Sequence, residues 1–156
     1  MNITEALIQA VAEIVTMFGI NASFQREEAE QHLTSANQVN VLVGFSNSLT
    51  GNMVLELDKS SALLIISAMM GGMEVTNLDE MARSGLGEIL NMIAGTTFRK
   101  VQPHEITDLS PPTIVTGNNV FLMISRIQSN KILFQFDNPQ ASGAFTISYS
   151  MEKASA

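Results

Sequence analysis

Cysteine and tryptophan are absent from this 156-residue chain, and tyrosine occurs once. Without cysteine the protein can form neither a disulfide nor a thiolate metal site, which fits a reducing compartment. The two histidines, His32 and His104, lie far apart in the sequence and have no partner at a metal-ligand spacing, so we expect no metal or other cofactor. A glycine-rich phosphate loop of the Walker type and a G-x-S-x-G motif are missing too.

Positive charge is scarce. Eight Lys and Arg residues stand against fifteen Asp and Glu, and the formal net charge at pH 7 is −7. Nucleic acids and anionic membranes both require a concentrated basic patch, so neither is expected as a partner. The longest apolar stretch, residues 62–73, contains Ser67 and two glycines and is too short to cross a bilayer. The N-terminus lacks the positive flank of a signal peptide, and we therefore expect a soluble, cytoplasmic protein.

The pattern of apolar residues predicts one α+β domain over residues 1–156, with a frayed tail from about residue 151. The expected architecture has two layers, a largely antiparallel sheet with long helices packed on one face. The predicted helices cover residues 2–19, 61–70 and 77–98, and the second is expected to be buried because it is apolar on nearly all sides. The predicted strands cover residues 39–45, 51–57, 114–127 with a break at 117–119, 131–137 and 144–149.

The segments between these elements are predicted as connections. Residues 21–37 are polar and charged and are expected to form an exposed connection with a short edge strand. Residues 102–113 hold three of the four prolines and are expected to form a loop. Turns are expected over residues 128–130 and 138–143.

The first and third predicted helices resemble each other. Glu13 and Thr16 in the first helix recur as Glu88 and Asn91, both 75 residues later. Because strands follow each helix, the fold is expected to consist of two pseudo-repeated helix-plus-sheet halves. The alternative is that two amphipathic helices share such a pattern by chance.

The helix over residues 79–95 has an unusual polar face. At about 100° per residue, Ser84, Glu88 and Asn91 fall within roughly 60° of one another. The opposite face is apolar, as in a helix packed on a core, and consists of Leu86, Ile89, Leu90 and Ile93. The helix also contains three glycines, each of which costs roughly 1 kcal/mol relative to alanine, namely Gly85, Gly87 and Gly95. A helix with such a sequence usually admits another backbone or a partner close to it.

Glu88 and Asn91 are three residues apart on a helix, so their side chains project side by side. A carboxylate can accept a proton or pair with a cation, and an amide can both donate to and accept from one water. The pair suits the orientation of a nucleophilic water better than covalent attack. The structural alternative is a solvated acid beside a helical asparagine.

Together these residues resemble a known family. Ser84-x3-Glu88-x2-Asn91, followed by a loop with Ser110-Pro111-Pro112-Thr113 and by strands, is similar to the motif of the CheC/CheX/FliY chemotaxis phosphatases. The resemblance covers almost the whole chain, and the single intact motif is most similar to the CheX branch. Only residues 92–110 separate Asn91 from Pro111, a shorter loop than the family pattern has, which is expected to affect partner fit more than chemistry.

The resemblance implies a phosphatase for the aspartyl phosphate of a phosphorylated CheY-like response regulator. Asn91 would position the attacking water, and Glu88 would pair with the receiver's lysine. Ser84, Gly85, Gly87 and Gly95 would contact the partner, and the required Mg²⁺ would belong to the receiver domain and not to this chain. Thr16 has no amide to replace that of Asn91, so Glu13 and Thr16 are expected to be inactive.

The family likeness also implies a homodimer, for which sheet extension is a plausible means of pairing. Two other functions remain open. The chain could be a non-catalytic module that docks on a receiver or a signalling partner through the same helix. It could also be a structural dimer in which Glu88 and Asn91 are buried at the interface.

Overall fold

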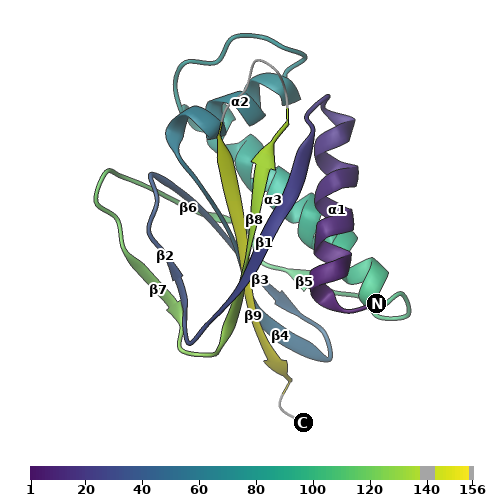
Figure 1. Ribbon diagram of the computed structural model, residues 1–156. Coiled ribbons are helices and arrows are strands. Elements are labelled where there is room, and N and C mark those ends of the chain that lie inside the picture. The colour runs from purple at the N-terminus through teal and green to yellow at the C-terminus, as the bar shows by residue number, and fades with distance from the viewer. Residues whose placement is uncertain (138–142, 155–156) are drawn as a thin grey trace.

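In the computed structural model, which describes residues 1–137 and 143–154, helices cover one face of an antiparallel sheet (Figure 1). This confirms the predicted α+β class with two layers. The helices are α1 (Ile3–Met17), α2 (Lys59–Met69) and α3 (Glu80–Val101). The strands are β1 (Ala22–Glu30), β2 (Leu33–Ser35), β3 (Val39–Ser46), β4 (Leu49–Leu57), β5 (Asp108–Leu109), β6 (Thr113–Thr116), β7 (Leu122–Ser125), β8 (Ser129–Phe136) and β9 (Ala144–Lys153).

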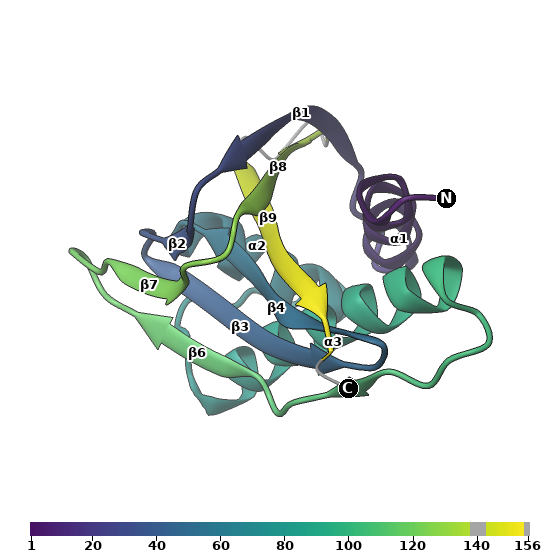
Figure 2. The ribbon, with the colours of Figure 1, turned by 90° about the horizontal axis from the view of Figure 1, so that it is seen from below.

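The main sheet has the strand order β1-β8-β9-β4-β3, and both β5 and β6 pair with β3. Strands β1, β3 and β4 follow α1 in the chain, and β6, β8 and β9 follow α3 in the same order. Each strand of the first set occupies the place in the sheet that is equivalent to that of its counterpart in the second set. The sheet therefore has an approximate twofold axis between its central strands β9 and β4. The short strands β2 and β7 pair with each other, and α1 lies beside α3 (Figure 2). The predicted pair of helix-plus-sheet halves is thus confirmed by the topology.

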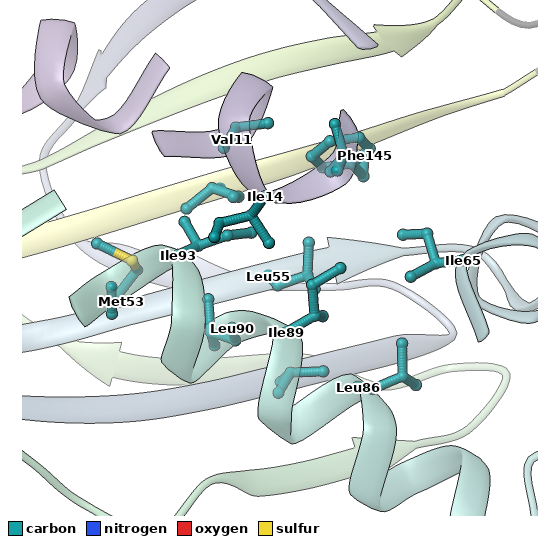
Figure 3. Close-up of a cluster of buried hydrophobic side chains, with 14 of the residues drawn as sticks. Val11, Ile14, Met53, Leu55, Ile65, Leu86, Ile89, Leu90, Ile93 and Phe145 are labelled. Carbon is teal, nitrogen blue, oxygen red and sulfur yellow. The ribbon is translucent and has the colours of Figure 1, made fainter. Parts of the chain in front are cut away.

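The core lies between the helices and the sheet. Alternate residues of the strands point toward the helices, as the twofold periodicity of a strand requires, and Met53, Leu55 and Phe145 are buried there. The helices contribute the residues spaced three and four apart on their inner faces, including Val11 and Ile14 of α1 (Figure 3). This packing fixes which face of each helix is left for solvent or for a partner.

Both ends of α1 follow from the sequence. The Asn2 side chain caps the helix by accepting a hydrogen bond from the Glu5 backbone N–H at 2.8 Å. Gly19 follows the last turn with φ of +75°, a conformation that favours glycine. The first predicted helix is confirmed at both ends.

Two predictions at the sheet were wrong. The polar segment over residues 21–37 contains β1, a nine-residue edge strand on β8, rather than only a short strand. Its side chains are mostly exposed, so no apolar alternation marked it. The tail expected to fray from residue 151 instead continues β9 through Lys153, because Met151–Lys153 pair with Leu49–Gly51 of β4.

Two helix predictions also need correction. Helix α3 begins at Glu80 and not at the predicted residue 77, and Asp79 caps it by accepting a hydrogen bond from Ala82 N–H at 2.8 Å. Helix α2 is buried along one side only, at Ser61, Ala62, Ile65 and Ile66, although nearly all of its positions are apolar. The predicted turn over residues 138–143 lies outside the described residues except for Gly143, and residues 128–130 mostly belong to β8.

Candidate active site on helix α3

Helix α3 is held firmly at its inner face and its ends. Leu86, Ile89, Leu90 and Ile93 are each at most 2% exposed and pack against α1 and the sheet, as predicted (Figure 3). Arg99 and Lys100 lie in the last turn, where positive charge favours the negative end of the helix dipole. The outer face of a 22-residue helix is therefore presented from a rigid support.

The predicted catalytic pair lies on this outer face. Glu88 and Ser84 are exposed to solvent, whereas Asn91 is half-buried. The Asn91 side-chain oxygen, Oδ1, is buried and has no hydrogen-bond partner among the described residues. An unpaired buried polar atom costs roughly 1–3 kcal/mol, so such atoms are uncommon and often mark a functional site. Asn91 is therefore half-buried beside exposed Glu88, with an amide oxygen that no described residue satisfies; the hydroxyls of Ser61, Ser148 and Ser150 are likewise buried without a partner in the described residues.

Pro112 covers the helix one turn before Asn91. A Cβ atom on Gly87 would lie 2.5 Å from Pro112 Cγ, which is closer than atoms can approach. Gly87 is buried, so its missing side chain makes room for a segment of this chain and not for a partner, which corrects that part of the prediction. The sequence predicts only a loop at Pro111 and Pro112, and no local pattern connects Pro112 with Gly87.

The loop that carries Pro112 is fastened to β3 by two hydrogen bonds. Ser110 N–H donates to the Gly44 carbonyl at 2.9 Å, and Gly44 N–H donates to Ser110 Oγ at 2.8 Å. The strand β6, which also pairs with β3, begins directly after Pro112. The contact between Pro112 and Gly87 therefore ties α3 to the edge of the main sheet.

The other two glycines have different surroundings. A Cβ atom on Gly85 would lie 2.9 Å from the Ile66 side chain of α2, so Gly85 also admits a segment of this chain. A Cβ atom on Gly95 would have only ordinary contacts, at 3.8 Å from Arg99 Nη1 and 4.0 Å from Leu109 Cδ1. Of the three glycines, Gly95 is the one at which an added methyl group would meet no clash.

The corresponding face of α1 is occupied differently. Glu13 Oε1 lies 2.6 Å from Lys100 Nζ, so this carboxylate is engaged in an ion pair with the end of α3. Thr16 is exposed and has a hydroxyl where α3 has the amide of Asn91. The structure thus places the two glutamates in unequal environments, one engaged within the chain and one exposed.

Exposed Glu88 and half-buried Asn91 lie on the outer face of α3 and suit a reacting group that is carried by another macromolecule. A carboxylate and an amide on the outside of a helix can reach a group on a protein surface, and neither is a covalent nucleophile of choice. Within residues 1–137 and 143–154, no three His, Asp or Glu side chains lie close enough to hold a metal ion. In the same residues, no helix is long and apolar enough to span a membrane.

Comparison with known proteins agrees with this fold. Residues 39–137 match the model of the family described as chemotaxis phosphatase CheX. The protein called CheY-P phosphatase CheX from Thermotoga maritima is 32% identical over 121 residues, which cover 76% of this chain and 78% of that protein.

Solved structures show the same fold at lower identity. The chemotaxis protein CheX from Desulfovibrio desulfuricans has a TM-score of 0.83 at 19% identity, covering 97% of this chain and 100% of that one. CheX from Vibrio vulnificus has a TM-score of 0.80 at 21% identity, and the match covers 96% of this chain and 99% of that one. A chain of the CheX–CheY–BeF3–Mg²⁺ complex from Borrelia burgdorferi has a TM-score of 0.67 at 17% identity, and the match covers 97% of this chain and 99% of that one.

The fold is that of the CheX and CheC-like chemotaxis proteins. The family model and the relative from Thermotoga narrow the assignment from a shared fold to one family. The chain belongs to the chemotaxis phosphatase CheX family. The expectation of an enzyme, a phosphoprotein phosphatase, is thereby confirmed.

Proposed function

We propose that this chain hydrolyses the aspartyl phosphate of a phosphorylated CheY-type response regulator, and that Glu88 and Asn91 act on it in trans. The relative from Thermotoga is called a CheY-P phosphatase, and the complex from Borrelia contains CheX with CheY. The observation that carries the proposal is the half-buried Asn91 amide, which lies on the same helix face as exposed Glu88 and has an Oδ1 with no partner among the described residues.

The reaction needs little covalent chemistry from the enzyme. Water attacks phosphorus, the bond between phosphorus and the aspartyl oxygen breaks, and the products are the free aspartate carboxylate and inorganic phosphate. The proton of the water leaves with the phosphate or to solvent. The receiver domain brings its own Mg²⁺ and lysine, which stabilise the phosphoryl charge, so the missing element is a water held in line.

In our proposal, Asn91 holds the attacking water in line with the bond that breaks. Its amide inserts next to the phosphoryl group and holds the attacking water by hydrogen bonds. Glu88 pairs with the receiver's lysine and sets the register of the two proteins. Because Asn91 is anchored to a helix that is buried on its other face, little ordering of the amide is required when the partner binds.

Other members of the site have supporting roles. Ser84 contacts the partner at the edge of the same face, and Gly95 allows a partner loop to approach closely. Glu13 and Thr16 do not form a second active site, because Glu13 is paired with Lys100 and Thr16 lacks an amide. We further propose that the protein acts in the cytoplasm as a homodimer.

The alternative is a docking module that binds the receiver without hydrolysing its phosphate. The exposed outer face of α3 would serve either function, and the role of Asn91 separates them. In a docking module, Asn91→Ala weakens binding and nothing else. In a phosphatase, the same variant loses turnover while binding largely survives.

The test uses Mg²⁺-loaded, phosphorylated receiver domains from the same organism and follows phosphate release. Wild-type protein and an Asn118→Ala control, altered in an exposed turn, are expected to accelerate release equally. Glu88→Gln and Asn91→Ala are expected to lose that acceleration. Measurable binding without acceleration by wild type would favour the docking module.

A further inference from the structure

The outer face of α3 continues beyond Asn91 to a positive charge. At about 100° per residue, Arg99 falls within roughly 80° of Ser84, Glu88, Asn91 and Gly95. The Arg99 side chain is exposed, and it folds back along the helix instead of extending into solvent. Its Nη2 donates a hydrogen bond to Thr96 Oγ1 at 3.1 Å, and its Nη1 lies 3.8 Å from the position of a Cβ on Gly95.

This arrangement brings the guanidinium group close to the proposed active site. Gly95 is one helical turn after Asn91, a rise of about 6 Å at 1.5 Å per residue. Leu109 Cδ1 of β5 lies 4.0 Å from the same Cβ position. A cationic and an apolar side chain therefore both border Gly95, one helical turn after Asn91.

The charge of Arg99 is not compensated within the part of the chain that the structure describes. The neighbouring Lys100 is paired with Glu13, Arg26 with Glu28, and Lys131 with Glu30 and Glu56. Arg99 has no carboxylate within ion-pair distance in that part, and its hydrogen-bond partner is the neutral hydroxyl of Thr96. In the same part of the chain Lys59, Arg83, Arg126 and Lys153 form no ion pair either, and Arg99 differs from them in lying on the face of α3 that carries Glu88 and Asn91.

We propose that Arg99 is a specificity-determining contact that binds a carboxylate of the receiver domain next to the phosphorylated aspartate. The inference rests on the proposed function. A guanidinium group binds a carboxylate through two parallel hydrogen bonds, which lysine cannot reproduce. The offset of about 6 Å from Asn91 favours a neighbouring carboxylate over the phosphoryl group that the water attacks. The apolar side chain of Leu109, which borders Gly95, shields one side of this ion pair from water.

The test compares steady-state hydrolysis by wild type and by Arg99→Gln, Arg99→Lys and Arg99→Glu, using Mg²⁺-loaded phosphorylated receivers. Arg99→Gln is expected to raise KM about tenfold and to leave kcat within about twofold, since the contact is the same in the ground and transition states. Arg99→Lys should fall between wild type and Arg99→Gln, and Arg99→Glu should have the highest KM. Raising the salt concentration should increase the KM of wild type by a larger factor than the KM of Arg99→Gln.

Arg126→Gln removes another exposed arginine and serves as the matched control with unchanged kinetics. Confirmation from the receiver side comes from charge reversal, because a receiver with the contacted Asp or Glu changed to Arg should regain affinity for Arg99→Glu.

Each outcome has a distinct meaning. Equal KM values for wild type and Arg99→Gln would overturn the inference while leaving the proposed function intact. A fall in kcat at unchanged KM would place Arg99 at the phosphoryl group and would overturn the carboxylate assignment. If wild type accelerates hydrolysis of no receiver, the proposed function fails and this inference fails with it.

Discussion

Pro112 occupies the space that a side chain on Gly87 would need, with Pro112 Cγ 2.5 Å from the position of that Cβ atom. The contact joins the proline loop to the helix that presents Glu88 and Asn91. It also explains why a buried position of α3 is glycine despite its low helix propensity.

Gly87→Ala should therefore destabilise the protein. The added methyl group clashes with Pro112, and overpacking of this kind typically costs about 1–3 kcal/mol. The loop or the helix must shift, so hydrolysis should fall together with stability. Urea denaturation and phosphate release on the same preparation measure the two effects. A variant as stable and as active as wild type would show that the contact is readily rearranged.

Gly95→Ala is the matched substitution in the same helix with the opposite expectation. Its methyl group meets nothing closer than 3.8 Å, and alanine favours a helix by roughly 1 kcal/mol over glycine. The variant should be more stable than wild type in urea. If the surface at Gly95 receives a partner loop, KM for the phosphorylated receiver should nevertheless rise. An unchanged KM would contradict the assignment of Gly95 to the partner interface.

Asn91→Ala should retain or gain stability even though it removes activity. The substitution eliminates a buried oxygen that has no partner among the described residues, and such an atom costs roughly 1–3 kcal/mol in the folded state. Thermal unfolding of wild type and variant provides the comparison. A clear loss of stability would mean that the amide is engaged in structure, as expected for a structural asparagine.

Restoring the motif in α1 should not create a second active site. The substitution Thr16→Asn adds an amide three residues after Glu13, but Glu13 remains bound to Lys100. Hydrolysis by this variant should equal that of wild type. The ion pair is largely exposed and is worth at most about 1 kcal/mol, so Glu13→Gln should leave stability nearly unchanged. A doubled turnover in Thr16→Asn would refute the inactivity of the α1 face.

The fold could largely be predicted from the sequence where apolar residues repeat. The inner face of α3, from Leu86 to Ile93, and the hairpin of β3 and β4 were predicted because burial imposes a regular spacing. Strand β1 was mostly missed, because an exposed edge strand shows no such spacing and is formed by backbone pairing with β8. The end of β9 was missed for the same reason, since pairing with β4 extends it.

The site was predictable only in part. The spacing of Glu88 and Asn91 placed both on one helix face, and helix geometry alone was sufficient for that. The surroundings of the glycines depend on which distant segments of the chain pack against α3. No local sequence pattern encodes that packing. The contact of Pro112 with Gly87 and the fold-back of Arg99 over Gly95 therefore emerged only from the three-dimensional structure.

The most direct test of the central claim is single-turnover decay of a phosphorylated, Mg²⁺-loaded receiver at saturating concentrations of wild type and of Asn91→Ala. Saturation removes any difference in affinity, so the decay rate reports the chemical step alone. Loss of a positioned water predicts decay about a hundredfold slower in the variant, although all of the receiver is bound. If the variant at saturation matches the wild-type rate, Asn91 contributes to docking only, and water positioning by Asn91 is contradicted.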